Sequence, residues 1–284
     1  MRLSVIMPGR KEPYMQRTID SFLEASRLAN DVEIIAVLDG PWITGLTHDS
    51  RVKQVMLKEP QGMRGAINAG LSYATGDYIL KVDAHCAFAP GFDKTMIEAC
   101  QDDWLMIPRR YSLNDALWGP QKINDPRDYH YLLYPAAGQM TPHNWGCQHK
   151  PWIDDTMTYQ GSCWMANREQ FMKRVGYLDD RVTTYGTFVA EQLEVGLKYW
   201  LGGGEVKVNK KTWYAHLWKM PRHYITGEFE KKSSWKANWQ WATRHWINDE
   251  EPGMVRPFSW LVEKFWPVPS WPEDRNQWRL NVVH

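Results

Sequence analysis

An aspartate and a histidine two positions apart, Asp83 and His85, form the clearest chemical feature of the sequence. They follow the apolar run YILKV, which is typical of a buried strand. Alternate residues of an extended chain project to the same side, so both side chains can reach one ion. A carboxylate oxygen with an imidazole nitrogen suits Mn²⁺ or a similar divalent cation that also binds phosphate oxygens. On spacing alone, the commoner arrangement is a strand end with a solvated aspartate and a hydrogen-bonded histidine.

The elements before this pair alternate between buried strands and amphipathic helices, which predicts an α/β fold. We expect strands at 3–7, 32–40, 52–58 and 77–85, and helices at 14–29 and 62–74. This order is typical of a mostly parallel sheet with helices on both faces. Ligands bind at the carboxyl ends of the strands in such sheets, so one rim would collect Pro8, Arg10, Asp39, Asp83 and His85.

The second half of the chain is less regular. From 109 to about 155 the periodicity fails, and we expect a long excursion around the rim, in which Asp154 and Asp155 fit either a rim position or a solvated turn. A helix is expected at 191–201, because three glycines follow it, and short strands at 205–209 and 212–218. We therefore divide the chain into a core domain at 1–219 and a basic extension at 220–284. The extension is rich in Trp and Pro, and we expect it to pack on the core with one helix near 233–247.

The composition excludes several classes of protein. With 284 residues, 43% of them hydrophobic and 24% charged, the chain is an ordinary globular one. A net charge of +1 provides no global field for polyanions. No apolar run approaches the ~18 residues of a membrane span, and the first residues lack the features of a signal peptide. Four cysteines without a CxxC pair fit a reducing compartment, so we expect a cytoplasmic protein. Motifs of P-loop ATPases, HExxH metalloproteases and GxSxG hydrolases do not occur.

Six segments in a fixed order carry a family resemblance. They are IMPGRKE, VLDG, GMRGAINAGLSYATGDYILKVDAHC, GSCWMANREQFMKRVGYLDD, AEQLEVGLKYWLGGG and WYAHLWK. Together they resemble glycosyltransferases of the GT-A fold in family 2, and within it the polypeptide N-acetylgalactosaminyltransferase branch. In that branch the usual D-x-D metal motif becomes D-x-H, and its LDAHC resembles VDAHC here. The resemblance covers about residues 3–219.

The resemblance implies a metal-dependent enzyme with a nucleotide-sugar donor. Its G-H-V-F-R segment corresponds to the residues around His216, so Asp83, His85 and His216 are the implied ligands of Mn²⁺ or Mg²⁺. A UDP-sugar is the implied donor. Two imidazoles and one carboxylate leave open positions for diphosphate oxygens, so the metal would act as a Lewis acid on the leaving group.

The same resemblance assigns further contacts to the donor. Asp39 corresponds to an acidic residue that recognises the nucleoside, although Leu38 replaces the first of the usual two aspartates. Donor-binding positions are also expected at Pro8, Arg10, Arg64, Asp83 and Gly161.

Glu191 is the candidate catalytic residue, since the family keeps a glutamate at the start of the corresponding helix. In inverting relatives the next residue is usually an aspartate that acts as the general base, where this chain has Gln192. Because Gln192 cannot accept a proton, inversion would have to use Glu191 itself. Retaining transfer needs no strong base, since the leaving diphosphate can take the acceptor proton. The stereochemical outcome stays open, with a preference for retention.

The acceptor is suggested by a local excess of charge. Between 198 and 246 there are ten basic and three acidic residues, a net charge of +7, together with seven tryptophans. Basic side chains interleaved with aromatic faces are typical of nucleic-acid grooves. The candidate acceptor-binding residues are Trp235, Trp239, Lys231, Lys232 and Lys236. The alternative is a Trp-rich clamp that buries the edge of the core, with solvated lysines around it.

Family members that act on secreted polypeptides carry a membrane anchor and a lectin-like domain, neither of which is expected here. Compact bacteriophage relatives glycosylate hydroxymethylated pyrimidines in DNA. The preferred acceptor is therefore 5-hydroxymethylcytosine or 5-hydroxymethyluracil in DNA, and the location is the host cytoplasm if a phage encodes the chain. A polysaccharide, a lipid-linked saccharide or a cytosolic protein hydroxyl are alternative acceptors, and a non-catalytic binding module is an alternative of another class. No protein partner is evident.

Overall fold

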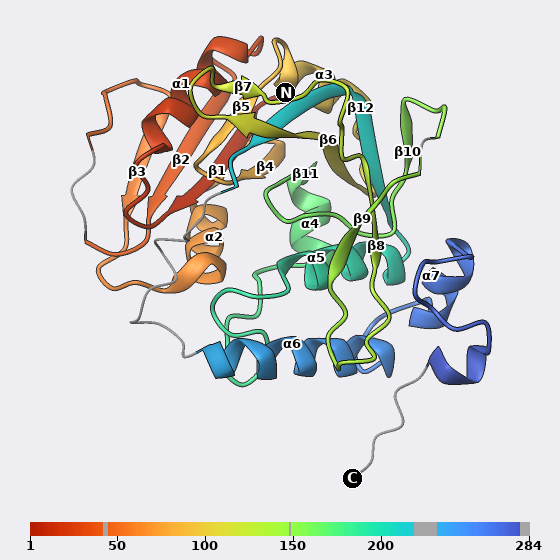
Figure 1. Cartoon of the computed structure of the whole chain (residues 1–284). Coiled ribbons are helices and arrows are strands. Elements are labelled where there is room, and N and C mark those ends of the chain that lie inside the picture. The colour runs from red at the N-terminus through yellow and green to blue at the C-terminus, as the bar shows by residue number, and fades with distance from the viewer. Residues whose placement is uncertain (42–44, 148, 219–231, 279–284) are drawn as a thin grey trace.

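The computed structural model describes residues 1–41, 45–147, 149–218 and 232–278. Its centre is a mixed sheet with the strand order β10-β12-β6-β11-β4-β1-β2-β3 (Figure 1). The expected α/β class is confirmed.

The first part of the sheet is parallel, as the alternating pattern predicts. It contains β1 (Leu3–Gly9), β2 (Val32–Leu38), β3 (Val52–Met56) and β4 (Tyr78–Val82). The helices α1 (Met15–Ala25) and α3 (Phe92–Ala99) lie on one face, and α2 (Gly62–Tyr73) lies on the other (Figure 1). Successive β1 residues point to opposite faces: Val5 packs in the cluster that contains α1 and α3, whereas Ile6 packs with α2.

The other part of the sheet mixes both directions. The strand β11 (Cys163–Asn167) runs antiparallel to β4, and β6 (Trp104–Asn114) runs parallel to β12 (Glu205–His216). Short strands extend the edges: β5 (Cys86–Phe88) and β10 (Ile153–Asp155) pair antiparallel with β12, and β7 (Gly119–Pro120) pairs with β6. The separate hairpin of β8 (Tyr129–Leu132) and β9 (Pro142–Trp145) lies in the excursion that lacked periodicity.

One element differs from the expectation. The two short strands expected at 205–209 and 212–218 are a single strand, β12, whose register against β6 shifts between Asn209 and Trp213. Because a bulge keeps the chain extended while it interrupts the pairing, the sequence there reads as a break between two strands.

The C-terminal helices share the core of the sheet domain. The helices α4 (Arg168–Arg174) and α5 (Glu191–Leu201) precede β12, while α6 (Lys232–Ile247), α7 (Phe258–Lys264) and a 3-10 turn at Arg275–Trp278 follow it. Trp246, Trp271 and Trp278 are buried in the same cluster as Trp200 of α5. Much of the tryptophan content therefore packs inside the protein. The boundary predicted at 219 and 220 lies outside the described residues.

In the described part of the chain, no helix is both long enough and apolar enough to cross a membrane.

Candidate active site

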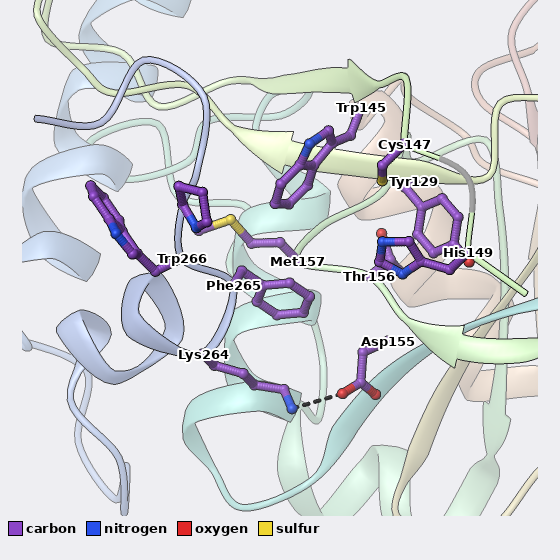
Figure 2. A pocket seen from close by; sticks show the side chains of 11 residues that line it. Tyr129, Trp145, Cys147, His149, Asp155, Thr156, Met157, Lys264, Phe265 and Trp266 are labelled. Carbon is purple, nitrogen blue, oxygen red and sulfur yellow. Dashed lines mark ion pairs between the residues drawn. The ribbon is translucent and has the colours of Figure 1, made fainter. Parts of the chain in front are cut away.

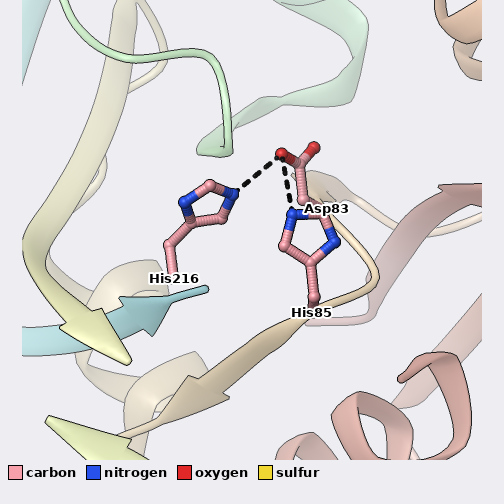
Figure 3. Close-up of side chains that lie close together, drawn as sticks. All are labelled: Asp83, His85 and His216. Atoms are coloured by element: carbon pink, nitrogen blue, oxygen red, sulfur yellow. Dashed lines mark hydrogen bonds and ion pairs between the residues drawn. The ribbon is translucent and has the colours of Figure 1, made fainter. Parts of the chain in front are cut away.

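Asp83, His85 and His216 come together at one end of the sheet, with ligand atoms within 4.8 Å of one another (Figure 3). Asp83 follows the last residue of β4, and its backbone N–H donates to the carbonyl of Ser162 at 2.9 Å. His85 directly precedes β5, and β5 pairs with the end of β12 so that His216 lies opposite Cys86. Strand pairing therefore brings the distant histidine to the D-x-H segment. We call these three residues the Asp-His-His cluster.

The geometry of the cluster fits a divalent metal. Asp83 Oδ2 lies 3.2 Å from His216 Nε2 and 3.9 Å from His85 Nε2, so all three atoms face one point (Figure 3). The other ring nitrogen of His85, Nδ1, lies 3.3 Å from Glu12 Oε2, an outer contact typical of metal-binding histidines. Burial lowers the pKa of His216 to about 4, so its ring is neutral at pH 7 and can offer a lone pair.

A buried lysine joins this cluster to Glu191. The ammonium of Lys81 contacts Asp83 Oδ1 at 2.8 Å, the carbonyl of Gly161 at 2.6 Å and Glu191 Oε2 at 3.2 Å. Burial opposes ionisation of Asp83, but the charge of Lys81 and the hydrogen bond to His216 hold its pKa well below the usual value. Lys81 was missed in the sequence, although a charged residue inside the apolar run YILKV signals a buried partner.

Glu191 lies at the first position of α5 and is 2% exposed. Its Oε1 accepts a 2.5 Å hydrogen bond from the indole N–H of Trp164, which the sequence did not single out. A Cβ at Gly161 would lie 3.3 Å from Oε2 of Glu191, so the small residue allows the close approach. The carboxylate is therefore fixed from two sides.

Asp39 lies where β2 meets the start of α2. Its side chain is buried and accepts hydrogen bonds from the backbone N–H groups of Gln61 at 2.6 Å and Gly62 at 3.1 Å. Burial raises the pKa of Asp39, against the effect of these two bonds and of the nearby charge of Arg10. Its backbone N–H donates to the carbonyl of Gly9 at 2.9 Å, so Pro8, Arg10 and Asp39 lie near one another at the rim, as expected.

Arg64 has a different environment from the one expected. It is fully buried, and its guanidinium donates to the carbonyls of Asp179 at 2.7 Å and Val189 at 2.9 Å and to the carboxylate of Glu194. Burial lowers its pKa to about 10. With these donors used inside the protein, the geometry favours a role in holding α5 and the loop before it over contact with a diphosphate.

The candidate acceptor residues are only partly described. Trp235 and Trp239 are half-buried against the core, and Trp235 stacks on Phe188 with ring centres 5.2 Å apart. Lys236 is exposed. Lys231 lies outside the described residues, and the structure describes only the backbone of Lys232.

Part of the local positive charge is used within the fold. Lys198 pairs with Glu194 and Glu251, Lys207 with Asp155 and Glu205, and Lys210 donates to Tyr129 Oη and the His149 carbonyl.

A separate cavity of about 300 Å³ lies between β9, β10 and the end of α7 (Figure 2). Trp145, Met157 and Phe265 form its apolar wall, and Asp155 pairs there with Lys264 at 2.7 Å. Asp155 is thus a partly buried, ion-paired residue rather than a solvated turn. No member of the Asp-His-His cluster lines this cavity.

Comparison with known proteins gives a consistent result. The model of the family described as "Glycosyl transferase family 2" matches residues 4–171. The chain is 21% identical over 71% of its length to "Probable N-acetylgalactosaminyltransferase 7" of Caenorhabditis elegans. It is 27% identical over 51% of its length to "Undecaprenyl-phosphate 4-deoxy-4-formamido-L-arabinose transferase" of Erwinia tasmaniensis.

Among solved structures, GalNAc-T7 with UDP, GalNAc and Mn²⁺ aligns with a TM-score of 0.68 and 16% identity. That alignment covers 87% of this chain and 49% of GalNAc-T7. S. aureus TarS with UDP-GlcNAc aligns with a TM-score of 0.54 and 14% identity, covering 84% of this chain and 64% of TarS. These likenesses show a shared fold. The chain spans 34% of the C. elegans relative and 47% of the Erwinia relative.

Proposed function

Because the chain belongs to glycosyl transferase family 2, and is thus a glycosyltransferase, we propose that it transfers a sugar from a UDP-sugar with the help of a divalent metal. The observation that carries this proposal is the Asp-His-His cluster at the carboxyl end of β4. The fold it shares with the UDP complexes of GalNAc-T7 and TarS supports the choice of donor.

Each residue at the rim would have a distinct task. Asp83, His85 and His216 would hold the metal, which when bound neutralises charge on the diphosphate leaving group. Asp39, fixed by the backbone of α2, would face the nucleoside with its remaining lone pairs. Pro8, Arg10 and Gly161 line the same rim.

Glu191 would act through its charge. Trp164 donates to its Oε1 and the Lys81 ammonium lies 3.2 Å from its Oε2, an arrangement that suits stabilising a charge better than collecting a proton. An ionised carboxylate there would stabilise the positive charge that develops on the sugar as its bond to the diphosphate breaks. The new bond forms to the acceptor oxygen, and the acceptor proton passes to the departing diphosphate. This assignment favours retention.

A hydrolysis screen tests the donor assignment. Purified protein would be incubated with UDP-sugars, with Mn²⁺, with Mg²⁺ and with excess EDTA, and release of UDP measured. We expect release with at least one UDP-sugar, dependent on the metal. Full activity in excess EDTA would contradict the metal-dependent mechanism. If the protein released no UDP from any donor although its Asp-His-His cluster was intact, the non-catalytic alternative would be favoured.

For the acceptor, we propose the hydroxyl of a 5-hydroxymethylpyrimidine in DNA. Two observations support it beyond the net charge of +7 between 198 and 246. Trp235 stacks on Phe188, three residues before Glu191, so the start of α6 lies beside the loop that leads into the site. Lys236, Gln240 and Arg244 are exposed at spacings of four residues, which gives α6 a polar stripe with two positive charges.

The acceptor test compares matched substrates. DNA containing 5-hydroxymethylcytosine or 5-hydroxymethyluracil, the same DNA without the hydroxyl, a peptide rich in Ser and Thr, and an oligosaccharide would each be offered with the active donor. Sugar transfer only to hydroxymethylated DNA is expected. Transfer to the peptide or the oligosaccharide instead would reject the DNA acceptor and leave the donor assignment intact.

A further inference from the structure

Lys81 is an unusual residue for its position. All five residues of β4 are buried, and Lys81 is 1% exposed between the apolar residues Leu80 and Val82. Burying an ammonium is costly unless it is paired and hydrogen-bonded. The fold must therefore supply partners for this charge.

The partners come from three separate segments. The Nζ atom lies 2.6 Å from the carbonyl oxygen of Gly161, 2.8 Å from Asp83 Oδ1 and 3.2 Å from Glu191 Oε2. The contacts with Gly161 and Asp83 are hydrogen bonds, whereas the contact with Glu191 is an ion pair. Lys81 thus connects the end of β4, the segment before β11 and the start of α5.

These contacts divide the two oxygens of Asp83 between different tasks. Oδ1 is taken by Lys81, whereas Oδ2 faces His216 at 3.2 Å and His85 at 3.9 Å (Figure 3). A carboxylate can bind a metal through one oxygen or through both. Here one oxygen is already engaged by a fixed cation.

We propose that Lys81 is a positioning residue: it makes Asp83 bind the metal through one oxygen, and it holds Glu191 at a fixed place beside the Asp-His-His cluster. The proposal rests on the metal-dependent function proposed above. The consequence is that the metal binds with low affinity when the nucleotide is absent. The positive charge of Lys81 would repel the divalent metal. Because Asp83 would provide only one oxygen, one more coordination position on the metal would be left for a diphosphate oxygen.

The test measures Mn²⁺ binding directly, without turnover. Free Mn²⁺ would be followed by electron paramagnetic resonance during titration of the metal-free protein, with and without UDP. Lys81→Met keeps most of the side-chain volume and removes the charge. We expect it to bind Mn²⁺ alone at least about tenfold more tightly, because a nearby repelling charge is gone and Asp83 can use both oxygens. We also expect UDP to tighten Mn²⁺ binding less than it does in the wild-type protein.

Three further variants separate positioning from general damage. Lys81→Arg keeps the charge, and its Mn²⁺ affinity is expected to stay within about threefold of wild type. Lys207→Met removes a comparable ion-paired lysine, bound to Asp155 and Glu205 away from the cluster, and should leave Mn²⁺ binding unchanged. Lys81→Met combined with Glu191→Gln removes one buried charge of each sign, and serves if the single variant does not fold.

The outcomes are distinct. If the wild-type protein binds no Mn²⁺, the proposed function fails. If wild type binds Mn²⁺ but folded Lys81→Met binds it equally or more weakly, the role of Lys81 is refuted while the proposed function stands. If neither neutral variant folds, as judged by circular dichroism, Lys81 serves the fold and the positioning role is refuted as well.

Discussion

His216 Nε2 lies 3.2 Å from Asp83 Oδ2, although 133 positions separate the two residues in the sequence. The contact exists because β5 and the end of β12 pair at Cys86 and His216. The Asp-His-His cluster thus depends on the pairing of β5 with β12.

Replacing His216 tests this dependence. We expect His216→Ala to lower UDP release by about 10²-fold or more, as the loss of a group that supports a charged leaving group should. The matched control is His149→Ala, because His149 pairs with Asp154 away from the cluster and should keep its activity. Equal activity of the two variants would remove His216 from the site.

Glu191→Gln keeps the shape of the side chain and removes its charge. We expect sugar transfer to fall by about 10²-fold or more while UDP binding changes little, because the effect falls on the transition state. The melting temperature should fall as well, since buried Lys81 loses one of its two carboxylate partners. Calorimetric titration with UDP and a thermal melt on the same sample provide the comparison. Turnover close to wild type would instead show that Glu191 only holds its contacts with Trp164 and Lys81.

Arg64→Met tests whether this arginine serves the fold. The change leaves the buried carboxylate of Glu194 with Lys198 as its remaining cation, so we expect a loss of about 3 kcal/mol in the free energy of unfolding. Adding Glu194→Gln should recover part of that loss. Urea denaturation gives both values. Unchanged stability with greatly weakened UDP binding would restore the donor-binding role first expected for Arg64.

Acid should destabilise the metal-free protein through His130. Burial, together with the charges of Arg110 and Arg127, lowers the pKa of His130 to about 3, and Arg110 Nη2 lies 3.2 Å from its Nε2. Between pH 3 and the ordinary histidine pKa near 6.5, His130 is protonated in the unfolded chain but neutral in the folded one. The free energy of unfolding therefore falls as the pH falls. From pH 6.5 to 5 this group should cost about 2 kcal/mol. Urea denaturation with EDTA should show a smaller loss for His130→Gln; an equal loss would assign the effect to other groups.

The stripe on α6 gives a salt-dependent prediction. If DNA is the acceptor, log affinity should fall with log salt concentration by about 0.9 per phosphate contact. Lys236→Ala with Arg244→Ala should weaken binding to every DNA sequence and spare UDP release. A variant pair that binds DNA like wild type would exclude the stripe as a contact surface.

Trp235 needs two measurements on the same variant. Because it stacks on Phe188, Trp235→Ala should lower the melting temperature. An additional loss of ~1–3 kcal/mol in DNA affinity is expected if its exposed part also stacks on a base. A lower melting temperature with unchanged DNA affinity would assign it to packing alone.

The sequence predicts the elements well where the pattern is local. The helix at 191–201 and the alternation up to β4 follow from spacing and glycine positions, and Asp83 with His85 follows from the strand period. His216 could be added only through the family resemblance, because nothing local indicates which distant strand pairs with β5. The partners of Arg64 were hidden for the same reason: Glu194 and the Val189 carbonyl lie 130 and 125 positions away.

The interruption within β12 has a consequence for how the chain can change in length. Residues 205–209 align with 104–108 of β6, whereas 213–216 align with 109–112, so three residues of β12 have no counterpart. The two parts of the strand are therefore held independently. A residue lost or gained near the exposed Lys211 can be absorbed there without rotating His216 away from Asp83. The part of β12 that pairs with β10 can thus change in length while residues 213–216 keep their register against β6, and with it the orientation of His216.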